Sequence, residues 1–437
     1  MGCKHFIKNN KMKKTILIPG LILAVTNLIF AQTNLQMRNW FISPKKIEMP
    51  FGTSPVVTSL PANAPNCQKM ANGMYDVNNN LLFYVSDGNV YDYNSTLIGT
   101  INPAAAGGEI AIVPFGDNDN ITSQSCKRKY SIFTTGGGYI PGGSRPVVLV
   151  HTVLDLNSFS LTSTIVDTMP FDQEFGCLAV SKANATGSRF VYFMAATGDA
   201  NNAGRIDMVV LDKNGNVSAP TVILGPTLPS NIPSGYQLFS RELELSPDGK
   251  WLAWARYTNT AATCCGGGRY NYIELNPSTG LMVANSFVNF DIPGISGNNV
   301  SGFRGLEFYQ PASNNTTLFM GAGSDGIKYS VFPPTGTFNP VIGSNLNPGY
   351  GFSQIEHSFN GFMYVSSGGT GSYNVGAFDP SPSAPPTMLA SANSITLTNP
   401  LPPNSGWQGT PFYTLPDQID GENYINSLAQ PISLPLP

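Results

Sequence analysis

The chain has 437 residues, of which 41% are hydrophobic and only 11% are charged, whereas soluble domains average about 25% charged residues. Glycine (45) and proline (35) are so frequent that they exclude a coiled coil or a helical bundle. The hydrophobic share excludes a disordered chain, and a net charge of −3 without a basic stripe argues against nucleic acid as a partner. The composition therefore favours a large all-β protein with short strands and polar turns.

The first 32 residues read as an N-terminal extension and a secretory signal peptide. Residues 12–32 begin with two lysines, continue with an apolar run from Thr15 to Phe30, and end on a small residue before a polar segment. The run is short for a membrane span, so a retained anchor is the alternative. Residues 1–32 hold five lysines and no acid, which leaves 18 basic and 26 acidic residues of the 23 and 26 in the chain, a net charge of −8. We expect an exported protein that is periplasmic, bound at the outer surface or extracellular, with no membrane span after cleavage.

Five cysteines follow the predicted cleavage site, an odd number that leaves at least one thiol outside intramolecular disulfides. Their spacing does not match a zinc site, and the sequence indicates no metal and no cofactor. An adjacent pair followed by glycines offers a strained vicinal disulfide as an alternative to an ordinary loop cysteine. The five residues are Cys67, Cys126, Cys177, Cys264 and Cys265.

Short apolar segments rich in β-formers recur every 44 to 67 residues or so. Most are followed by Gly or Asp-Gly and then by a second apolar segment, which is the pattern of a β-hairpin because the turn needs positive φ. A shorter apolar strand precedes five of the six. The six segments are 81–85, 130–133, 190–193, 251–255, 318–320 and 362–365, and the preceding strands are 110–113, 178–181, 243–246, 306–309 and 355–358.

Each repeat therefore predicts an antiparallel sheet of three or four strands, which is too small to bury both of its faces alone. Radial stacking of such sheets buries them and forms a β-propeller. Six repeats lie inside the chain, and Trp40-Phe41 together with residues 406–413 would supply a seventh blade closed by both ends of the chain. We predict one seven-bladed domain over residues 33–424, with six or eight blades as alternatives, and a short Pro-rich tail over residues 425–437.

The segment from Ser246 to Trp254, Ser-Pro-Asp-Gly-Lys-Trp-Leu-Ala-Trp, resembles the repeat signature of TolB-like and WD40-like propellers, in which Pro-Asp-Gly turns between the first two strands of a blade. Further segments resemble exported propellers of Bacteroidetes that are associated with gliding motility or type IX secretion; they are 39–41, 80–91, 112–114 with 130–133, and 415–421. This resemblance implies a secreted, non-catalytic propeller, often joined to a C-terminal sorting domain. Only 13 residues follow Tyr424, so periplasmic residence or a truncated gene are the alternatives to export across the outer membrane.

Glutamates occupy one register position in three successive first strands, at Glu244, Glu307 and Glu356. Arg241 and Arg304 precede two of them by three residues, an offset that places the two side chains on opposite faces of a strand. Because blades pack face to face, we interpret the set as ion pairs and hydrogen bonds between blades. A carboxylate-lined channel mouth that binds a cation or a polar ligand is the alternative, and these five residues are the candidate binding set.

Catalytic patterns are weak. Only His151 and His357 follow the signal peptide, and both lie in apolar strands where a packed histidine is the simpler interpretation. Glu242 and Glu244 share one strand face and could in principle serve glycoside hydrolysis. The acidic segments 117–120 and 212–216 read as turns rather than calcium loops. Trp251 and Trp254 are three positions apart, so we expect their side chains to lie on opposite faces of the strand and to pack against different neighbouring blades. We predict no catalytic residue.

These observations favour an exported, non-catalytic propeller that binds an envelope or surface partner, a protein or a glycan, through its long Gly/Asn loops. An envelope enzyme that acts on polysaccharide is one alternative. A structural spacer truncated from a larger surface adhesin is the other.

Overall fold

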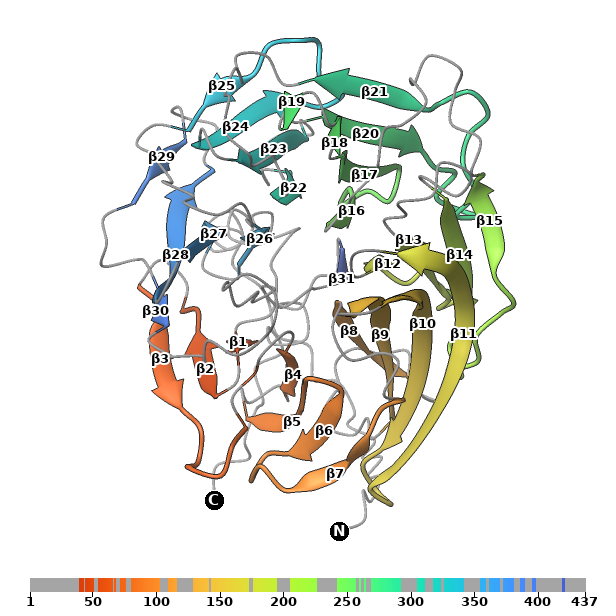
Figure 1. Cartoon of the computed structure of the whole chain (residues 1–437), viewed down its shortest axis with the longest axis vertical. Helices are drawn as coiled ribbons and strands as arrows, with labels where there is room; N and C mark the ends of the chain where they lie inside the picture. The colour runs from red at the N-terminus through yellow and green to blue at the C-terminus, as the bar shows by residue number, and fades with distance from the viewer. Residues whose placement is uncertain are drawn as a thin grey trace, which may run out of the picture.

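The protein is a ring of seven β-sheets around a central axis, a seven-bladed β-propeller (Figure 1). In this computed structural model, the described residues contain no helix. The described residues are 39–42, 44–50, 54–65, 67, 71–75, 80–102, 109–115, 129–140, 143–172, 176–194, 205–225, 242–256, 259–260, 263–264, 269–291, 305–310, 317–323, 326–341, 354–358, 361–369, 372–380, 386–389, 395–397 and 419–420.

The first four blades follow the chain in order, and neighbouring strands within each blade are antiparallel. Blade 1 is β1 (Asn39–Ile42), β2 (Lys45–Glu48) and β3 (Val56–Ser59). Blade 2 is β4 (Ala71–Tyr75), β5 (Leu81–Ser86), β6 (Asn89–Asp92) and β7 (Leu97–Thr100). Blade 3 is β8 (Ile110–Phe115), β9 (Lys129–Ile140), β10 (Gly143–Asp155) and β11 (Ser160–Asp172). Blade 4 is β12 (Cys177–Ser181), β13 (Arg189–Met194), β14 (Ile206–Leu211) and β15 (Thr221–Leu224).

The remaining three blades complete the ring. Blade 5 is β16 (Leu243–Leu245), β17 (Trp251–Arg256), β20 (Arg269–Glu274) and β21 (Val288–Asp291), with a separate two-stranded hairpin, β18 (Asn259–Thr260) and β19 (Thr263–Cys264). Blade 6 is β22 (Gly305–Tyr309), β23 (Leu318–Gly323), β24 (Gly326–Val331) and β25 (Asn339–Pro340). Blade 7 is β26 (Ile355–His357), β27 (Met363–Gly369), β28 (Ser372–Asp379), β29 (Thr387–Met388) and β30 (Ile395–Leu397).

The hydrophobic core lies between the blades rather than within any one of them. Six clusters of buried side chains connect each blade to the next around the whole ring, and one of them joins blades 7, 1 and 2. Both faces of most strands are buried for this reason, which accounts for the burial of every residue in β13, Arg189–Met194. A seven-bladed propeller was the predicted fold, and the strand order confirms it.

Blade 1 closes the ring through the aromatic pair that the sequence suggested for this role. Trp40 packs edge-on against Tyr364 of blade 7, with ring centroids 5.2 Å apart, and Phe41 stacks on Tyr84 of blade 2 at 4.3 Å. Gly73 makes the second contact possible, because a Cβ atom there would lie 2.8 Å from Cβ of Phe41. Residues 406–413, the other half of the predicted closure, lie outside the described residues.

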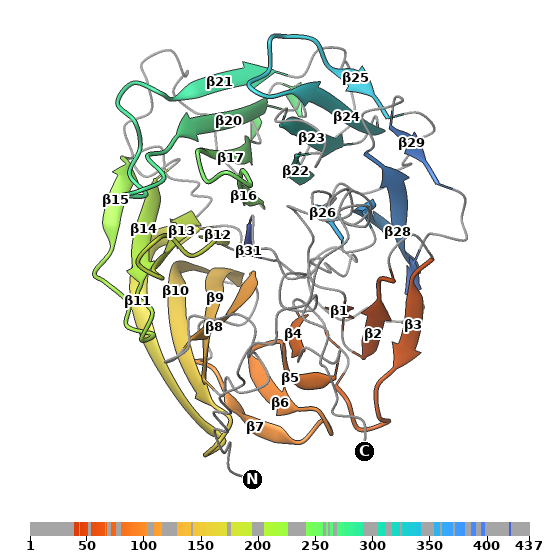
Figure 2. The ribbon, with the colours of Figure 1, turned by 180° about the vertical axis from the view of Figure 1, so that it is seen from behind.

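The C-terminal end of the described chain adds an unexpected strand. Residues Ile419–Asp420 form β31, which pairs in parallel with β12 of blade 4 through Val180 and Ser181. This segment therefore lies near the axis of the ring and not in blade 1 (Figure 2). This pairing joins only two residues of each strand, and the strands are more than 200 positions apart in the sequence. No sequence pattern could have predicted it.

The two tryptophans of blade 5 point to opposite faces of their strand, as their spacing predicted. Trp254 belongs to the cluster between blades 4 and 5, whereas Trp251 packs against the cluster between blades 5 and 6. They do not form a joint platform, because an offset of three along a strand sends their side chains to opposite faces. Trp251 meets Tyr272 and Phe332 edge-on instead.

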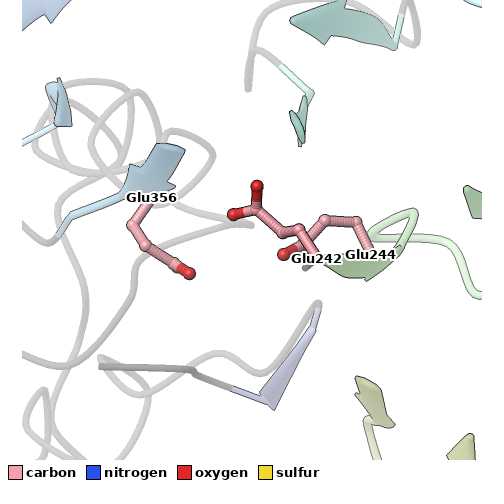
Figure 3. A group of neighbouring side chains, drawn as sticks. All are labelled: Glu242, Glu244 and Glu356. Carbon is pink, nitrogen blue, oxygen red and sulfur yellow. The ribbon is translucent and has the colours of Figure 1, made fainter. Parts of the chain in front are cut away.

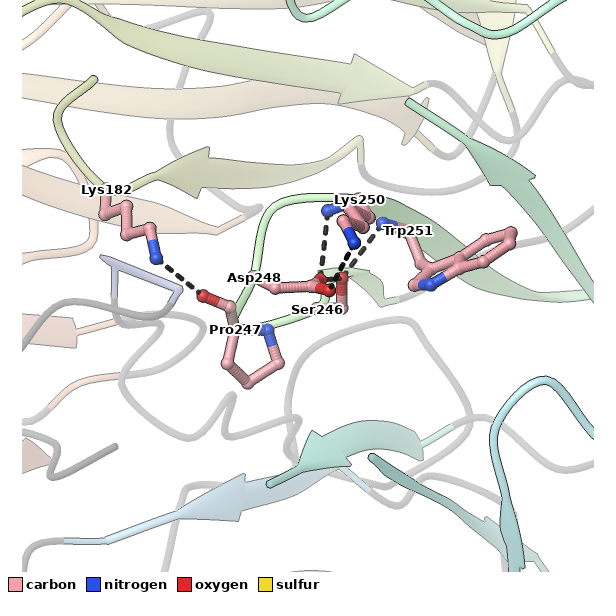
Figure 4. A network of polar contacts seen from close by, with 6 residues as sticks. All are labelled: Lys182, Ser246, Pro247, Asp248, Lys250 and Trp251. Atoms are coloured by element: carbon pink, nitrogen blue, oxygen red, sulfur yellow. Dashed lines mark hydrogen bonds and ion pairs between the residues drawn. The ribbon is translucent and has the colours of Figure 1, made fainter. Parts of the chain in front are cut away.

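The Pro-Asp-Gly segment turns between the first two strands of blade 5, as the resemblance implies. The backbone N–H of Gly249 donates to the carbonyl of Ser246 at 2.7 Å, and Gly249 has a φ of 72°, a conformation that favours glycine. The Ser246 hydroxyl accepts from the N–H of Trp251 and bonds the carboxylate of Asp248 at 2.6 Å. Lys182 of blade 4 donates to the carbonyl of Pro247 at 3.1 Å, so the turn is also tied to its neighbour (Figure 4).

Among the described residues no helix has the length and hydropathy of a membrane span. Of the cysteines, Cys67 and Cys177 are buried thiols. Cys67 donates to Asp87 at 3.5 Å and Cys177 donates to the carbonyl of Met194 at 3.7 Å. The signal-peptide region 1–32, the tail 425–437 and the segment 117–120 lie outside the described residues, so the predictions for them stay predictions.

Candidate functional site

The first strands of blades 2 to 7 lie nearest the axis, and consecutive first strands contact one another from β4 to β26 (Figures 1 and 2). Although they are in contact, no two of the described first strands pair with each other, because each belongs to a separate sheet. Their backbone amides therefore need other acceptors. Buried glutamates supply several of them.

Glu242 is the clearest case. It immediately precedes β16 and is only 1% exposed. Its Oε2 accepts a hydrogen bond from the backbone N–H of Leu306 in blade 6 at 2.6 Å, and its Oε1 accepts from the N–H of Ile355 in blade 7 at 3.3 Å. One carboxyl group thus fastens three consecutive blades.

Glu109 and Glu307 act in the same way in other blades. Oε2 of Glu109, immediately before β8, accepts from the N–H of Leu178 in blade 4 at 2.6 Å. Oε2 of Glu307 in β22 accepts from the N–H of His357 in blade 7 at 3.3 Å, and its Oε1 accepts from the next residue along the chain. Glu109 and Glu242 hold the same position relative to their strands, one residue before the first apolar side chain, so the contact is a repeated feature of the fold.

Burial changes the proton affinity of these groups. Desolvation raises the pKa of Glu307 to about 8, although the two backbone hydrogen bonds oppose the shift. Desolvation also raises the pKa of Glu242 well above its ordinary range, with further contributions from the nearby Glu109 and Glu307. Glu307 is therefore mostly protonated at pH 7. A raised pKa is a property that general acids share, but both oxygens of each of these two groups already accept backbone amides.

Glu242, Glu244 and Glu356 come together from two blades. Each offers a carboxylate oxygen within 4.8 Å of the others, and all three residues are buried (Figure 3). Oxygen donors at this spacing are of the kind that hold Ca²⁺ or Mg²⁺. The same closeness of like charges also favours shared protons. These three residues are the ones that could hold a metal ion in the described part of the chain.

The predicted binding set is thus only partly visible. Glu244, Glu307 and Glu356 are all buried on first strands, and the structure brings Glu244 and Glu356 together. Arg241 and Arg304 lie outside the described residues, so the Arg–Glu pairs between blades remain a prediction. Glu109 and the hydrogen bonds that Glu242 makes between blades were not predicted from the sequence. The available signal was a glutamate directly before a first strand in two of the repeats.

The two histidines are packed, as their apolar strands predicted. His151 bonds the hydroxyl of Ser131 at 2.9 Å and stacks on Phe133, and desolvation lowers its pKa to about 4. His357 is buried and meets the ring of Tyr309 edge-on at 5.2 Å. The segment from Asp212 is a hairpin turn, in which the Asp212 carboxylate accepts the N–H groups of Asn214 and Asn216.

An exposed aromatic residue lies at the tip of the β10–β11 hairpin. The side chain of Phe159 is 56% exposed, and its backbone has a φ of 51°, in the left-handed region. That conformation costs a residue with a Cβ about 1 kcal/mol or more, and the phenylalanine, which is more than half exposed, gains little burial in return. Strained residues of this kind cluster at binding sites, so Phe159 is a candidate contact for a partner.

No protein-family model matches the chain, and no curated protein matches its sequence. Solved structures to which it is similar include a protein from Lactobacillus plantarum, with 12% identity, 73% of this chain and 94% of that chain covered and a TM-score of 0.38. The N-terminal domain of Nup159 has 10% identity, coverages of 84% and 90% and a TM-score of 0.38. A putative exo-beta-1,3-galactanase from Bifidobacterium bifidum has 12% identity, coverages of 67% and 93% and a TM-score of 0.35. Likenesses this distant say nothing about activity.

Proposed function

We propose that the protein is an exported, non-catalytic β-propeller that binds a protein or glycan partner at the cell envelope or surface. In this proposal it belongs with the TolB-like and WD40-like propellers of the kind associated with gliding motility or type IX secretion in Bacteroidetes. The turn at Ser246–Trp251, built as that resemblance implies, supports the assignment.

The observation that carries the proposal is the use of the inner acids. A glycosidase needs one carboxyl group that can reach the leaving group and a second that can reach the sugar or a water molecule. Glu242 is 1% exposed, and its two carboxylate oxygens accept hydrogen bonds from backbone amides of blades 6 and 7. Glu307 likewise accepts two amides. A substrate could reach the carboxyl groups of Glu242 and Glu307 only if the neighbouring blades separated.

The partner surface in this proposal is the rim of hairpin tips on one face, with Phe159 as the exposed anchor. Aromatic side chains contribute strongly to protein interfaces and also stack on sugar rings. The neighbouring tip residues are polar: Asn157 donates its N–H to Asp155, and the hydroxyls of Ser158 and Ser160 bond each other. A polar fringe around an aromatic ring suits either class of partner.

The test combines binding and turnover on the full chain. Wild type, Phe159→Gly and a control, Val222→Thr, are compared on a glycan array and by cross-linking to envelope extracts with identification of the captured protein. Val222 is 51% exposed on the outer strand of blade 4 and so matches Phe159 in exposure alone. We expect saturable binding that Phe159→Gly weakens at least tenfold and Val222→Thr leaves unchanged. Release of reducing sugar from an envelope polysaccharide, abolished by Glu242→Gln or Glu307→Gln, would instead establish the enzyme alternative. Absence of any binding would favour the spacer.

A further inference from the structure

A polar pair lies in the seam between blades 3 and 4, away from the inner acids. Asp207 on β14 is 1% exposed and is held by the guanidinium of Arg205 in a fork, with Nε to Oδ1 at 3.0 Å and Nη2 to Oδ2 at 2.5 Å. Asp167 on β11 belongs to the opposite blade and is 9% exposed. The rest of the seam holds one apolar cluster and three other buried ionisable groups: Glu109, His151, which stacks on Phe133 of the cluster, and Arg189, which pairs with Leu211 of the cluster.

A β-bulge directs Asp167 into this seam. Along β11, Ile165 pairs with Val150 and Asp167 pairs with Leu149, so Val166 is an extra residue in the ladder. Val150 belongs to the cluster between blades 2 and 3, whereas Leu149 belongs to the cluster between blades 3 and 4. Without the bulge, Asp167 would lie on the same side as Ile165. A bulge that re-aims a single side chain is a common device next to functional groups.

The hydrogen bonding of Asp167 is complete only if it holds a proton. Its Oδ1 accepts the N–H of Thr168 at 2.7 Å, and within the described residues its Oδ2 receives no hydrogen bond. Asp207 faces the same seam from β14, because it pairs with Phe193 of the cluster to which Leu149, the partner of Asp167, also belongs. Two carboxylates bond each other only when they share a proton. Desolvation, with Asp207 adding to it, raises the pKa of Asp167 from its ordinary 3.8 to about 6, and Arg205 opposes the shift.

We propose that Asp167 and Asp207 form a pH-sensitive latch across the seam between blades 3 and 4, closed when they share a proton and loosened when that proton leaves. Arg205 remains paired with Asp207 in both states, so it offsets only part of the second negative charge that appears on Asp167. The residues paired beside the two aspartates, Leu149, Phe193 and Val222, carry no charge.

The sign of the dependence follows from the direction of the shift. An acid whose pKa is higher in the folded protein than in the unfolded chain stabilises the fold at low pH. That contribution is fully present below pH 3.8 and is lost as the pH rises through about 6. The latch therefore stabilises the seam more at pH 5 than at pH 7.5.

Met169 reports on the latch. It lies two residues beyond Asp167 on the same face of β11, is 1% exposed, and belongs to the apolar cluster of this seam. Loosening the seam would admit peroxide to its thioether, which oxidises to the sulfoxide. Met320 is equally buried but lies in the seam between blades 6 and 7, so it serves as a control within the same molecule.

The experiment treats the full chain with dilute hydrogen peroxide at pH 5 and pH 7.5 and follows both methionines by peptide mass spectrometry. We expect Met169 to oxidise at least threefold faster at pH 7.5 and Met320 to react equally slowly at both. Asp167→Asn, which cannot ionise, should make Met169 slow at both pH values. An equal rate for Met169 at both pH values in the wild type would overturn the proposal. So would a parallel rise at Met320, which would show that the whole ring loosens. The wild-type comparison stands alone if the variant does not fold.

Discussion

Glu242 in blade 5 accepts a hydrogen bond at 2.6 Å from the backbone N–H of Leu306 in blade 6. Glu109 repeats this contact with Leu178, also at 2.6 Å, between blades 3 and 4. A carboxyl group before a first strand therefore supplies the acceptor that an amide near the axis would otherwise lack. The inner acids of this propeller are best understood as fasteners between its blades.

Removing Glu109 should destabilise the protein. Glu109→Ala leaves the buried N–H of Leu178 without this acceptor, a loss that typically costs about 1–3 kcal/mol. Glu109→Gln retains a carbonyl oxygen at the same place and should lose less. Urea unfolding measures both. If the two variants unfold at the wild-type midpoint, the contact does not hold the blades together.

The stability of the protein should fall with pH through the titration of Glu307. Its pKa is about 8 in the folded protein and near its ordinary 4.5 in the unfolded chain. The folded state therefore keeps a proton that the unfolded chain releases. The stability from this group is fully present below pH 4.5 and is lost as the pH rises through about 8.

Glu307→Gln tests that sign because glutamine cannot ionise. The melting temperature of the wild type should decrease between pH 5 and pH 8.5, and that of the variant should decrease less. Parallel curves for the two proteins would mean that Glu307 does not titrate in this range.

Two glycines should respond to alanine for different reasons. At Gly73 the added Cβ would meet Cβ of Phe41 at 2.8 Å, so the blade 1–blade 2 contact must shift, and overpacking of this kind costs about 1–3 kcal/mol. At Gly249 the space is open and only the positive φ opposes the change, at about 1–2 kcal/mol. Denaturant unfolding of both variants gives the values. Because Phe41 also stacks on Tyr84, Gly73→Ala should change the near-UV circular dichroism of the aromatic residues, whereas Gly249→Ala should not.

Phe159 should contribute nothing to folding. Glycine accepts a φ of 51° without strain, although it gains entropy in the unfolded chain. Phe159→Gly should therefore leave the free energy of unfolding unchanged or raise it by up to about 1 kcal/mol, whereas Phe159→Ala keeps the strain and should be less stable than the glycine variant. A loss of more than about 1 kcal/mol in the glycine variant would show that the ring packs in the fold.

The fold was readable from the sequence because apolar segments followed by turn signals recur along the chain. The strand around Phe83 and the blade 1 pair Trp40-Phe41 followed from that recurrence, and the opposite placement of Trp251 and Trp254 followed from the alternation of side chains along a strand. Local patterns do not specify which backbone N–H donor a buried acid will contact in a neighbouring blade.

The site was harder to predict for that reason. Glu242 and Leu306 are 64 residues apart, and their contact depends on the radial packing of two complete sheets. The same holds for Asp167, whose direction depends on one bulged residue, Val166. The small number of acidic residues did indicate that the inner glutamates have a role. The structure shows that they are buried and accept hydrogen bonds from backbone amides.

The most direct test of the account compares urea unfolding and polysaccharide turnover in the wild type and Glu242→Ala. This change frees the amides of both Leu306 and Ile355, so we expect a larger loss of stability than for Glu109→Ala, about 2–5 kcal/mol, with no release of reducing sugar by either protein. A variant that unfolds at the wild-type urea midpoint but has lost a polysaccharide-degrading activity that the wild type possesses would contradict the account.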